Sequence, residues 1–195
     1  MKIAIVNYGV GNIMSIKHCL DRLGISHNYT SDPYEILSSN KVIFPGVGDA
    51  SYAMKKLKNQ NLHKIIVDIK HPLLGICLGM QLLCKSSEEG DTKCLGIIDS
   101  DVKKFDNKNL KVPQIGWNNI TELKSKIFKG IKENEFVYMV HSYYVPKSNY
   151  TIANSTYGIN YSSAINKNNF YGTQFHPEKS GSVGEKIIKN FIEEI

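Results

Sequence analysis

Arginine is the residue that this sequence most nearly lacks. A single arginine, Arg22, stands among 24 lysine and arginine residues, and the formal net charge is +6. Proteins that read phosphates and guanine favour arginine forks and basic stripes. The dense lysine patches here, at 55–58 and 103–104, are short. The composition therefore argues against a nucleic-acid-binding protein and favours lysines spread over a solvated surface.

The sequence also has no long hydrophobic run and few cysteines. The apolar run at residues 3–6 is too short for a membrane span or a signal peptide, so we expect a cytosolic protein. Cys19, Cys77, Cys84 and Cys94 have neither the C-x-x-C spacing of zinc sites nor the density of a disulfide scaffold. No phosphate loop occurs either. We expect reduced thiols, no metal and no cofactor.

What the sequence does contain is an alternating pattern of apolar strands and helices. Its 195 residues, 42% of them hydrophobic, fit a single domain over 1–195. The expected strands are 2–7, 25–30, 41–44 and 72–76, and the expected helices are 13–23, a short one opened by Asp32 as N-cap and Pro33, and a helical region reaching about 70. Gly24 closes the first helix. Such alternation predicts a parallel sheet.

The second half changes character. Short β-rich segments are expected near 95–105, 110–121, 135–145, 150–154, 158–165 and 169–175, and an amphipathic helix near 183–194. Between the halves, a partly buried helix carrying Met80, Leu82, Leu83 and Cys84 is expected, with its exit at 86–90. The sequence thus predicts an α/β fold: an open, mostly parallel twisted sheet flanked by helices, with antiparallel strands added in the C-terminal half.

The most informative segment places Cys77 in a G-x-C-x-G pattern between an apolar strand and a helix. This is the pattern of a nucleophile elbow, with sulfur in place of oxygen. Its glycines, Gly75 and Gly79, let strand and helix approach closely, and the helix N-terminus favours a thiolate. Cys19, Cys84 and Cys94 lack this context, so we interpret them as buried apolar residues. Alone, the pattern is as compatible with chance as with catalysis.

A thiol nucleophile needs a base and a group that orients the base. His176 and Glu178 follow the last predicted strand, separated by a proline. In an extended segment, residues two apart point the same way, so the carboxylate could reach the imidazole. The other five histidines have no comparable context. His176 and Glu178 are therefore the candidate base and orienting group.

Together the two segments resemble the class I, triad-type glutamine amidotransferases. Within that family, the chain is most similar to the glutaminase subunits of imidazole glycerol phosphate synthase. The similarity spans essentially the whole chain and rests on the motifs at 7–15, 45–48, 75–83, 112–118, 140–144 and 172–181. Asn7 stands where that family often has aspartate, and Gln114 where it often has histidine.

The resemblance implies Cys77 as nucleophile, His176 as base and acid, and Glu178 as the orienting carboxylate. The backbone N–H of Leu78 is the first candidate donor of an oxyanion hole, and the resemblance places a gated second donor around Val47 and Gly48. It also suggests Gly46, Gln81, Ser142 and Tyr143 as glutamine-binding residues, although helix surface and sheet edge would explain the last three equally.

The resemblance further implies a partner, a phosphate-binding (β/α)₈-barrel synthase subunit that receives the ammonia in a heterodimer. Asn12, Trp117, Asn118 and Lys179 match positions that face that partner in the family. A buried core aromatic is nearly as good an interpretation of Trp117.

Three other functions remain open from sequence alone. A paralogue could give ammonia to another acceptor, for example in building an amidino sugar. A stand-alone cysteine hydrolase, such as a γ-glutamyl hydrolase, would need no barrel. A catalytically idle regulatory subunit is disfavoured because Cys77, His176 and Glu178 are intact.

Overall fold

The computed structural model describes residues 1–106 and 108–195. Its α-helices are α1 (Ile13–Arg22), α2 (Pro33–Leu37), α3 (Ala50–Asn59), α4 (Leu62–Asp68), α5 (Leu78–Leu82) and α6 (Gly181–Glu193). Its 3₁₀ turns are η1 (Glu89–Asp91), η2 (Lys126–Phe128) and η3 (Pro177–Lys179). Its strands are β1 (Ile3–Val6), β2 (His27–Thr30), β3 (Lys41–Gly46), β4 (Leu73–Cys77), β5 (Cys84–Ser87), β6 (Thr92–Lys93), β7 (Ile98–Lys104), β8 (Gln114–Asn119), β9 (Phe136–His141), β10 (Tyr143–Pro146), β11 (Thr151–Tyr157), β12 (Ile159–Lys167) and β13 (Phe170–Thr173).

One sheet of 11 strands runs through the molecule in the order β2-β1-β3-β4-β13-β12-β10-β7-β5-β6, with β11 paired to β12. From β2 to β13 the neighbours are parallel, and β12 then pairs antiparallel with β13, β10 and β11. The strands that pair antiparallel with β12 all come from the second half of the chain, and a further short antiparallel pair, β5 with β6, lies at the far edge of the sheet. The predicted α/β fold, with antiparallel additions in the C-terminal half, is confirmed.

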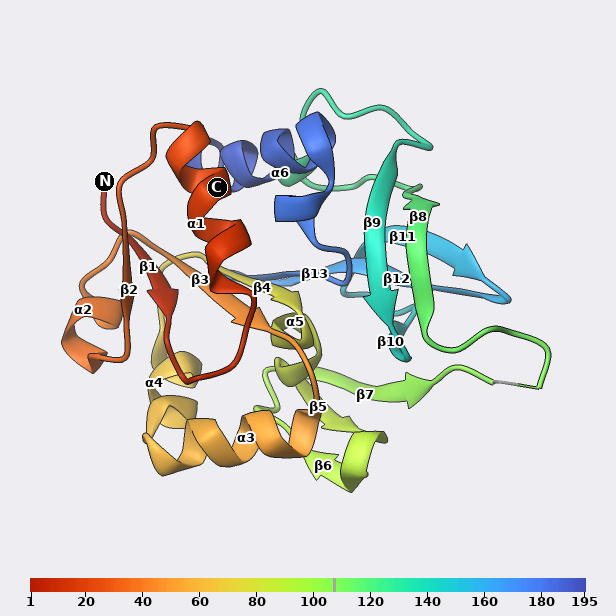
Figure 1. The fold of residues 1–195 in the computed structure, drawn as a ribbon, viewed down its shortest axis with the longest axis horizontal. Helices are drawn as coiled ribbons and strands as arrows, with labels where there is room; N and C mark the ends of the chain where they lie inside the picture. The colour runs from red at the N-terminus through yellow and green to blue at the C-terminus, as the bar shows by residue number, and fades with distance from the viewer. Residues whose placement is uncertain (107) are drawn as a thin grey trace.

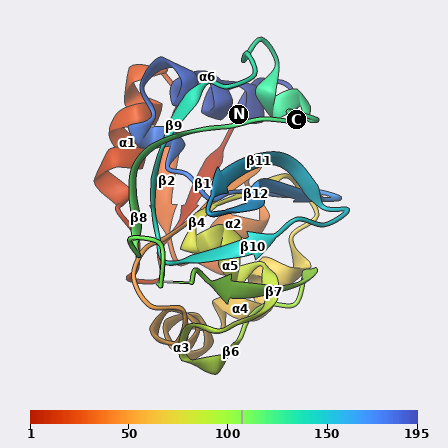
Figure 2. The same cartoon turned by 90° about the vertical axis from the view of Figure 1, so that its right-hand side faces the viewer.

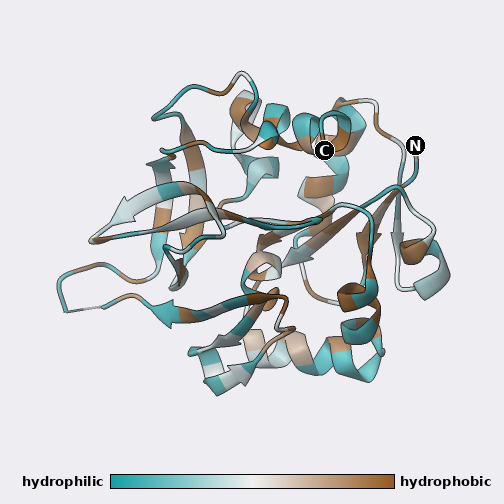
Figure 3. Ribbon diagram, turned by 180° about the vertical axis from the view of Figure 1, so that it is seen from behind, coloured by the Kyte–Doolittle hydropathy of each residue, from teal (hydrophilic) through white to brown (hydrophobic). Residues whose placement is uncertain are grey.

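Helices cover both faces of the parallel strands (Figure 1). One buried cluster joins α2, α3, α4 and α5 to the sheet through residues such as Ile36, Leu57 and Ile66. The other joins α1 and α6 to the opposite face through Ile16, Ile187 and Phe191. In Figure 3 the hydrophobic colour concentrates on the central strands, as expected for parallel strands buried on both faces.

Local sequence signals explain how the first helices begin and end. The Asp32 side chain accepts a hydrogen bond from Tyr34 N–H at 2.8 Å, and Pro33 occupies the first helical position. Gly24, just beyond α1, has φ +69°, the left-handed conformation that glycine adopts at helix ends. The predicted N-cap and helix end are therefore confirmed.

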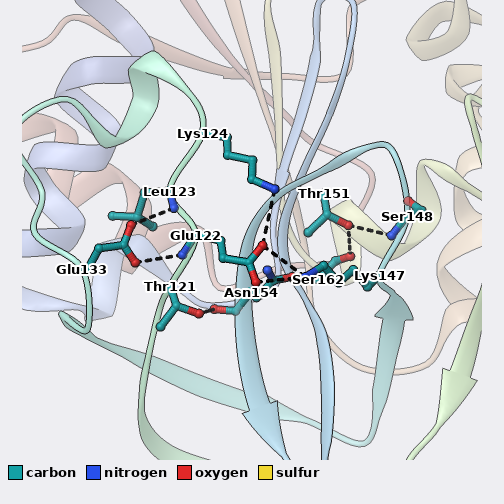
Figure 4. Close-up of polar contacts among 10 residues, drawn as sticks. All are labelled: Thr121, Glu122, Leu123, Lys124, Glu133, Lys147, Ser148, Thr151, Asn154 and Ser162. Atoms are coloured by element: carbon teal, nitrogen blue, oxygen red, sulfur yellow. Dashed lines mark hydrogen bonds and ion pairs between the residues drawn. The ribbon is translucent and has the colours of Figure 1, made fainter.

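The strands β8 and β9 form a separate two-stranded ribbon. In both views this ribbon runs across the strands of the main sheet (Figures 1 and 2). Beyond β8, Thr121 forms an isolated bridge with Asn154 of β11. The next residues are held by Glu133, whose carboxylate accepts from Glu122 N–H at 2.8 Å and from Leu123 N–H at 3.0 Å (Figure 4). The Thr121–Asn154 bridge ties one end of the ribbon to the main sheet, and the Glu133 contacts join the segment after β8 to the segment before β9.

The region after α5 differs from the sequence-based expectation. The helix ends at Leu82, and Cys84 begins β5 instead of continuing the helix. An apolar run such as 82–84 suits a helix or a strand, and pairing decides between them. Here Cys84 pairs with Ile98 of β7. The expected helix is therefore shorter, and its supposed exit contains a strand.

Candidate active site

The sheet order brings the two candidate catalytic segments together. The late strand β13 lies parallel to β4, with Thr173 opposite Ile76. Parallel neighbours end at the same edge of a sheet, where α/β proteins place their sites. Cys77 is the last residue of β4, and His176 follows three residues after Thr173. Segments about a hundred residues apart in the chain therefore meet at one sheet edge.

Cys77 sits on a strained turn between β4 and α5. Its backbone has φ +53° and ψ −110°, a conformation that non-glycine residues rarely adopt. A Cβ on Gly79 would collide with the Phe44 carbonyl oxygen, and one on Gly75 would lie 2.8 Å from the Gly79 carbonyl carbon. The G-x-C-x-G pattern thus marks a turn in which strand and helix touch, as predicted.

His176 and Glu178 form a buried pair. His176 Nδ1 lies 2.8 Å from Glu178 Oε1, and the two side chains are 2% and 1% exposed. The segment is a 3₁₀ turn over Pro177–Lys179, whereas the sequence argument assumed an extended chain. The backbone is pinned because His176 N–H donates to Tyr138 O at 3.0 Å and Ser180 Oγ donates to His176 O at 2.7 Å. The expected pairing is present, but a turn produces it.

The charge state of His176 follows from its neighbours. Burial lowers its pKa, but interactions with Cys77 and Glu178 outweigh burial and raise the pKa to about 10. Its other ring nitrogen, Nε2, is buried and has no hydrogen-bond partner among the described residues. A carboxylate on one nitrogen and an open second nitrogen suit a residue that moves a proton.

Cys77 and His176 line a common pocket of ≈ 260 Å³. The predicted oxyanion-hole residues Val47, Gly48 and Leu78 line it too, and so do the predicted glutamine-binding residues Gln81, Ser142 and Tyr143. Gly48 has φ +89°, which glycine alone adopts without strain. The pocket therefore gathers predicted residues from the ends of β3 and β4, from α5 and from the start of β10.

Gly46 lies outside the lining of this pocket. It pairs with Cys77 across the β3–β4 ladder, and a Cβ on it would lie 2.7 Å from Gly79 N. The missing side chain of Gly46 lets α5 pack against β3, and its contact with glutamine stays a prediction.

Two titratable residues of the pocket were given no role by the sequence reasoning. Glu89, in η1, lines the pocket, and its Oε2 accepts a hydrogen bond from Ala50 N–H at 2.9 Å. Burial raises the pKa of this carboxyl. His141 also lines the pocket, and burial lowers its pKa to about 4, which keeps the ring neutral. Glu88-Glu89 was interpreted as part of a helix exit, and His141, although it lies in the 140–144 motif, was assigned no role.

The two pocket histidines are expected to carry opposite charge states at pH 7. His176, with a pKa of about 10, should be protonated, and His141, with a pKa of about 4, should be neutral. Imidazole ¹⁵N NMR between pH 5 and 9 measures this directly. Because the folded pKa of His176 lies above the ordinary 6.5, its stabilising contribution is complete below pH 6.5 and is lost as the pH rises through about 10. Cys77→Ala should lower the His176 midpoint, and a wild-type midpoint near 6.5 would contradict the assignment.

The residues predicted to face a partner lie near the β8–β9 ribbon, except Asn12. Trp117 is 57% exposed, so it is not a core aromatic. Its ring centroid lies 6.1 Å from that of Tyr138, which belongs to β9. Lys179 Nζ lies 5.9 Å from the centroid of the same Tyr138 ring. Asn118 is held by a hydrogen bond from Nδ2 to Thr156 O at 2.9 Å. Asn12 precedes α1 and makes no side-chain cap.

The four cysteines are all free thiols. Burial raises the pKa of Cys19 to about 11, that of Cys94 to about 12 and that of Cys84 further still. Within residues 1–106 and 108–195, no group of three or more His, Cys, Asp or Glu side chains is arranged to hold a metal ion. In the same residues, no helix combines the length and apolarity that crossing a membrane requires.

Comparisons with known proteins agree on one family. The family model of class-I glutamine amidotransferases matches residues 4–195. The imidazole glycerol phosphate synthase subunit HisH of Bacteroides fragilis (strain YCH46) is 53% identical over 195 residues, which is 99% of this chain and 100% of that protein. The subunit of the same name from Buchnera aphidicola is 48% identical, with the same coverage. A crystal structure of a glutamine amidotransferase superposes with a TM-score of 0.74 at 17% identity, covering 97% of each chain.

Proposed function

The chain belongs to the class-I glutamine amidotransferase family, and from that premise we propose that it is the glutaminase subunit of imidazole glycerol phosphate synthase. In this role it hydrolyses glutamine to glutamate and ammonia in histidine biosynthesis, in the cytosol, with residues 1–195 acting as one amidotransferase domain. The observation that carries the proposal is the 53% identity to a subunit of that name over its whole length.

The chemistry begins with the Cys77 thiolate, which attacks the carboxamide carbon of glutamine. The resulting oxyanion collapses to a γ-glutamyl thioester as protonated His176 delivers a proton to the departing ammonia. His176 then takes a proton from water, which hydrolyses the thioester to glutamate. Glu178, 2.8 Å from Nδ1, holds the ring and stabilises its charge. The whole sequence of steps uses side chains of this one pocket and needs no cofactor.

The oxyanion needs donors aimed at it before it forms. The Leu78 N–H belongs to the first residue of α5, where no intrahelical acceptor exists, and Leu78 lines the pocket beside Cys77. The second donor is a backbone N–H from Val47 or Gly48, which line the same pocket. A glycine at φ +89° permits the peptide rotation that would aim or withdraw such a donor.

The amino-acid end of glutamine needs an anionic partner for its ammonium group and polar partners around it. Glu89 supplies a carboxylate in the pocket. Both N–H groups of Gln81 are used within the protein, on Tyr143 O at 3.0 Å and on Gln174 Oε1 at 2.9 Å. The remaining group, Gln81 Oε1, can only accept, which suits an ammonium ligand. Ser142 and Tyr143 complete this end.

The partner in this proposal is the (β/α)₈-barrel synthase subunit, which docks on the β8–β9 ribbon. Ile115, Trp117 and Phe136 are large apolar side chains of the ribbon, and each is more than half exposed. Exposed apolar groups that lie together mark interaction surfaces. Two residues of β9, Val140 and His141, also line the active-site pocket. The ribbon therefore borders both the pocket that holds Cys77 and the proposed docking surface, and Lys179 packs beside it on Tyr138. Asn12, which precedes α1, lies apart from the ribbon and stays a predicted partner contact.

The same surface bears on the alternatives. A stand-alone γ-glutamyl hydrolase has no need of exposed Trp117, and an idle regulatory subunit has no need of a complete Cys77–His176–Glu178 site. The rival that remains is a paralogue delivering ammonia to a different acceptor, such as an amidino-sugar precursor, through a similar barrel.

Complementation separates these functions. Co-expressed with its cognate barrel, the chain should restore growth without histidine to a strain that lacks this subunit, and a Cys77→Ala copy should not. Growth is the measurement, and soluble expression of both copies is the control. If the pair is soluble and hydrolyses glutamine in response to some other acceptor, yet never rescues growth, the histidine assignment is wrong and the paralogue is correct.

A further inference from the structure

A chain of buried side-chain amides connects the amino-acid end of the pocket to the nucleophile. Gln174, between β13 and His176, is completely buried. Its Nε2 lies 3.8 Å from Cys77 Sγ, and its Oε1 accepts a hydrogen bond from Gln81 Nε2 at 2.9 Å. Gln81 Nε2 in turn donates to Tyr143 O at 3.0 Å. The sequence reasoning used neither Gln174 nor any link between Gln81 and Cys77.

A backbone carbonyl fixes the orientation of both side-chain amides. Tyr143 O can only accept hydrogen bonds, so Gln81 must present its NH₂ group to it. Through the same NH₂ group, Gln81 donates to Gln174, so Gln174 must present its oxygen to Gln81. The NH₂ group of Gln174 then necessarily faces the sulfur. Rotating either amide by 180° would place two donors or two acceptors together in a buried site.

Besides His176, which interacts with Cys77, the sulfur has two hydrogen-bonding neighbours at equal distance with opposite preferences. Val140 O, 3.8 Å from Cys77 Sγ, can only accept, so it favours the protonated thiol. Gln174 Nε2, also at 3.8 Å, can only donate, so it favours negative charge on the sulfur. A donor directed at sulfur from a fully buried amide acts where water does not compete.

We propose that Gln174 is a positioning residue for the glutaminase reaction: its amide N–H holds the Cys77 sulfur for attack and favours the thiolate, in an orientation that Gln81 imposes. The inference rests on the proposed function, because it takes Cys77 as the nucleophile. Gln81 also lines the substrate pocket. The two linked amides therefore connect the binding of glutamine's amino-acid end to the protonation of the Cys77 sulfur.

The test is the pH profile of Cys77 alkylation by iodoacetamide, measured on the full chain with Cys77→Ala as the blank. Gln174→Met keeps an unbranched side chain of similar size and removes the donor. A hydrogen bond to a charged group contributes about 10- to 100-fold to an equilibrium. Gln174→Met should therefore move the half-maximal pH of alkylation upward by about one unit or more. It should also lower kcat for glutamine hydrolysis in the complex by about 10- to 100-fold, with KM changed far less.

Thr173→Val is the matched control, since Thr173 is the adjacent residue, is equally buried, and its hydroxyl has no hydrogen-bond partner among the described residues. It should leave the profile and kcat near wild type. Gln174→Glu provides a second variant if Gln174→Met does not fold, because it still accepts from Gln81 but places a carboxylate beside the sulfur, and a like charge disfavours the thiolate. It too should move the profile upward.

An unshifted alkylation profile in a folded Gln174 variant would overturn the positioning role, even if kcat fell. The proposed function fails differently, by Cys77→Ala retaining glutamine hydrolysis. If the Gln174 variants keep the wild-type alkylation profile and Cys77→Ala is inactive, the role of Gln174 is rejected and the proposed function stands.

Discussion

Replacing Cys77 by alanine is expected to abolish glutamine-dependent synthesis while ammonia-dependent synthesis continues. The nucleophile has no substitute in the pocket, since the other cysteines are buried elsewhere. Removing a triad nucleophile typically costs on the order of 10⁴-fold or more in kcat. The acceptor chemistry is assigned to the partner, so supplying ammonium salts should bypass the loss. Both rates are measured on the complex, with glutamine or ammonium chloride as nitrogen source.

The matched control for this experiment is Cys94→Ala, which removes a buried thiol outside the pocket. Both of its rates should stay near those of the wild type. If Cys77→Ala lost both rates while remaining folded and bound to its partner, the division of labour between the two subunits would be wrong. If it kept glutamine-dependent synthesis, Cys77 would not be the nucleophile.

The parts of the fold that could be predicted are those with local signals. Asp32 caps α2 and Gly24 ends α1 because side-chain oxygens and positive φ act within a few residues. The alternation of strands and helices likewise indicated a parallel sheet. Cys84 was misplaced because the apolar run 82–84 has no period of its own, and its pairing partner Ile98 lies in a strand formed later in the chain.

The site shows the same division. Cys77 was identifiable because its turn requires glycines on both sides, and His176 because it follows the last predicted strand with Glu178 two residues later. Glu89 escaped because its position depends on Ala50, 39 residues away. Gln174 escaped because its bonds reach back to residues 97 and 93 positions earlier. Trp117 was undecided because sequence does not distinguish a core aromatic from one at an interface, and its exposure depends on the ribbon.

The pairing of His176 with Glu178 was predicted for an inadequate reason. An extended segment would have aligned their side chains, but Pro177 begins a 3₁₀ turn instead. The turn is fixed from outside, since Tyr138 O and Ser180 Oγ bond the His176 backbone. A carboxylate that lies two residues away can therefore reach an imidazole in more than one backbone conformation, and spacing alone did not specify which.

The tightest constraint in the elbow predicts a large loss of stability from a single methyl group. In Gly79→Ala the new Cβ would collide with the Phe44 carbonyl oxygen, a main-chain atom that no rotamer change can move. Relief requires α5 to move away from β3, which also displaces Cys77 and Leu78. We expect Gly79→Ala to lower the free energy of unfolding by about 3 kcal/mol, the upper end for overpacked sites, and to reduce glutamine hydrolysis below detection.

Gly9→Ala separates this steric effect from backbone strain. Gly9 has φ +79°, but a Cβ there would meet no atom within 4 Å. Its substitution should therefore cost only the strain of a left-handed residue, about 1–2 kcal/mol. Urea denaturation of both variants, read by far-UV circular dichroism, gives the comparison. If both variants lost the same free energy of unfolding, α5 would be able to move away from the added methyl group. Gly79 would then not be required for close contact between strand and helix.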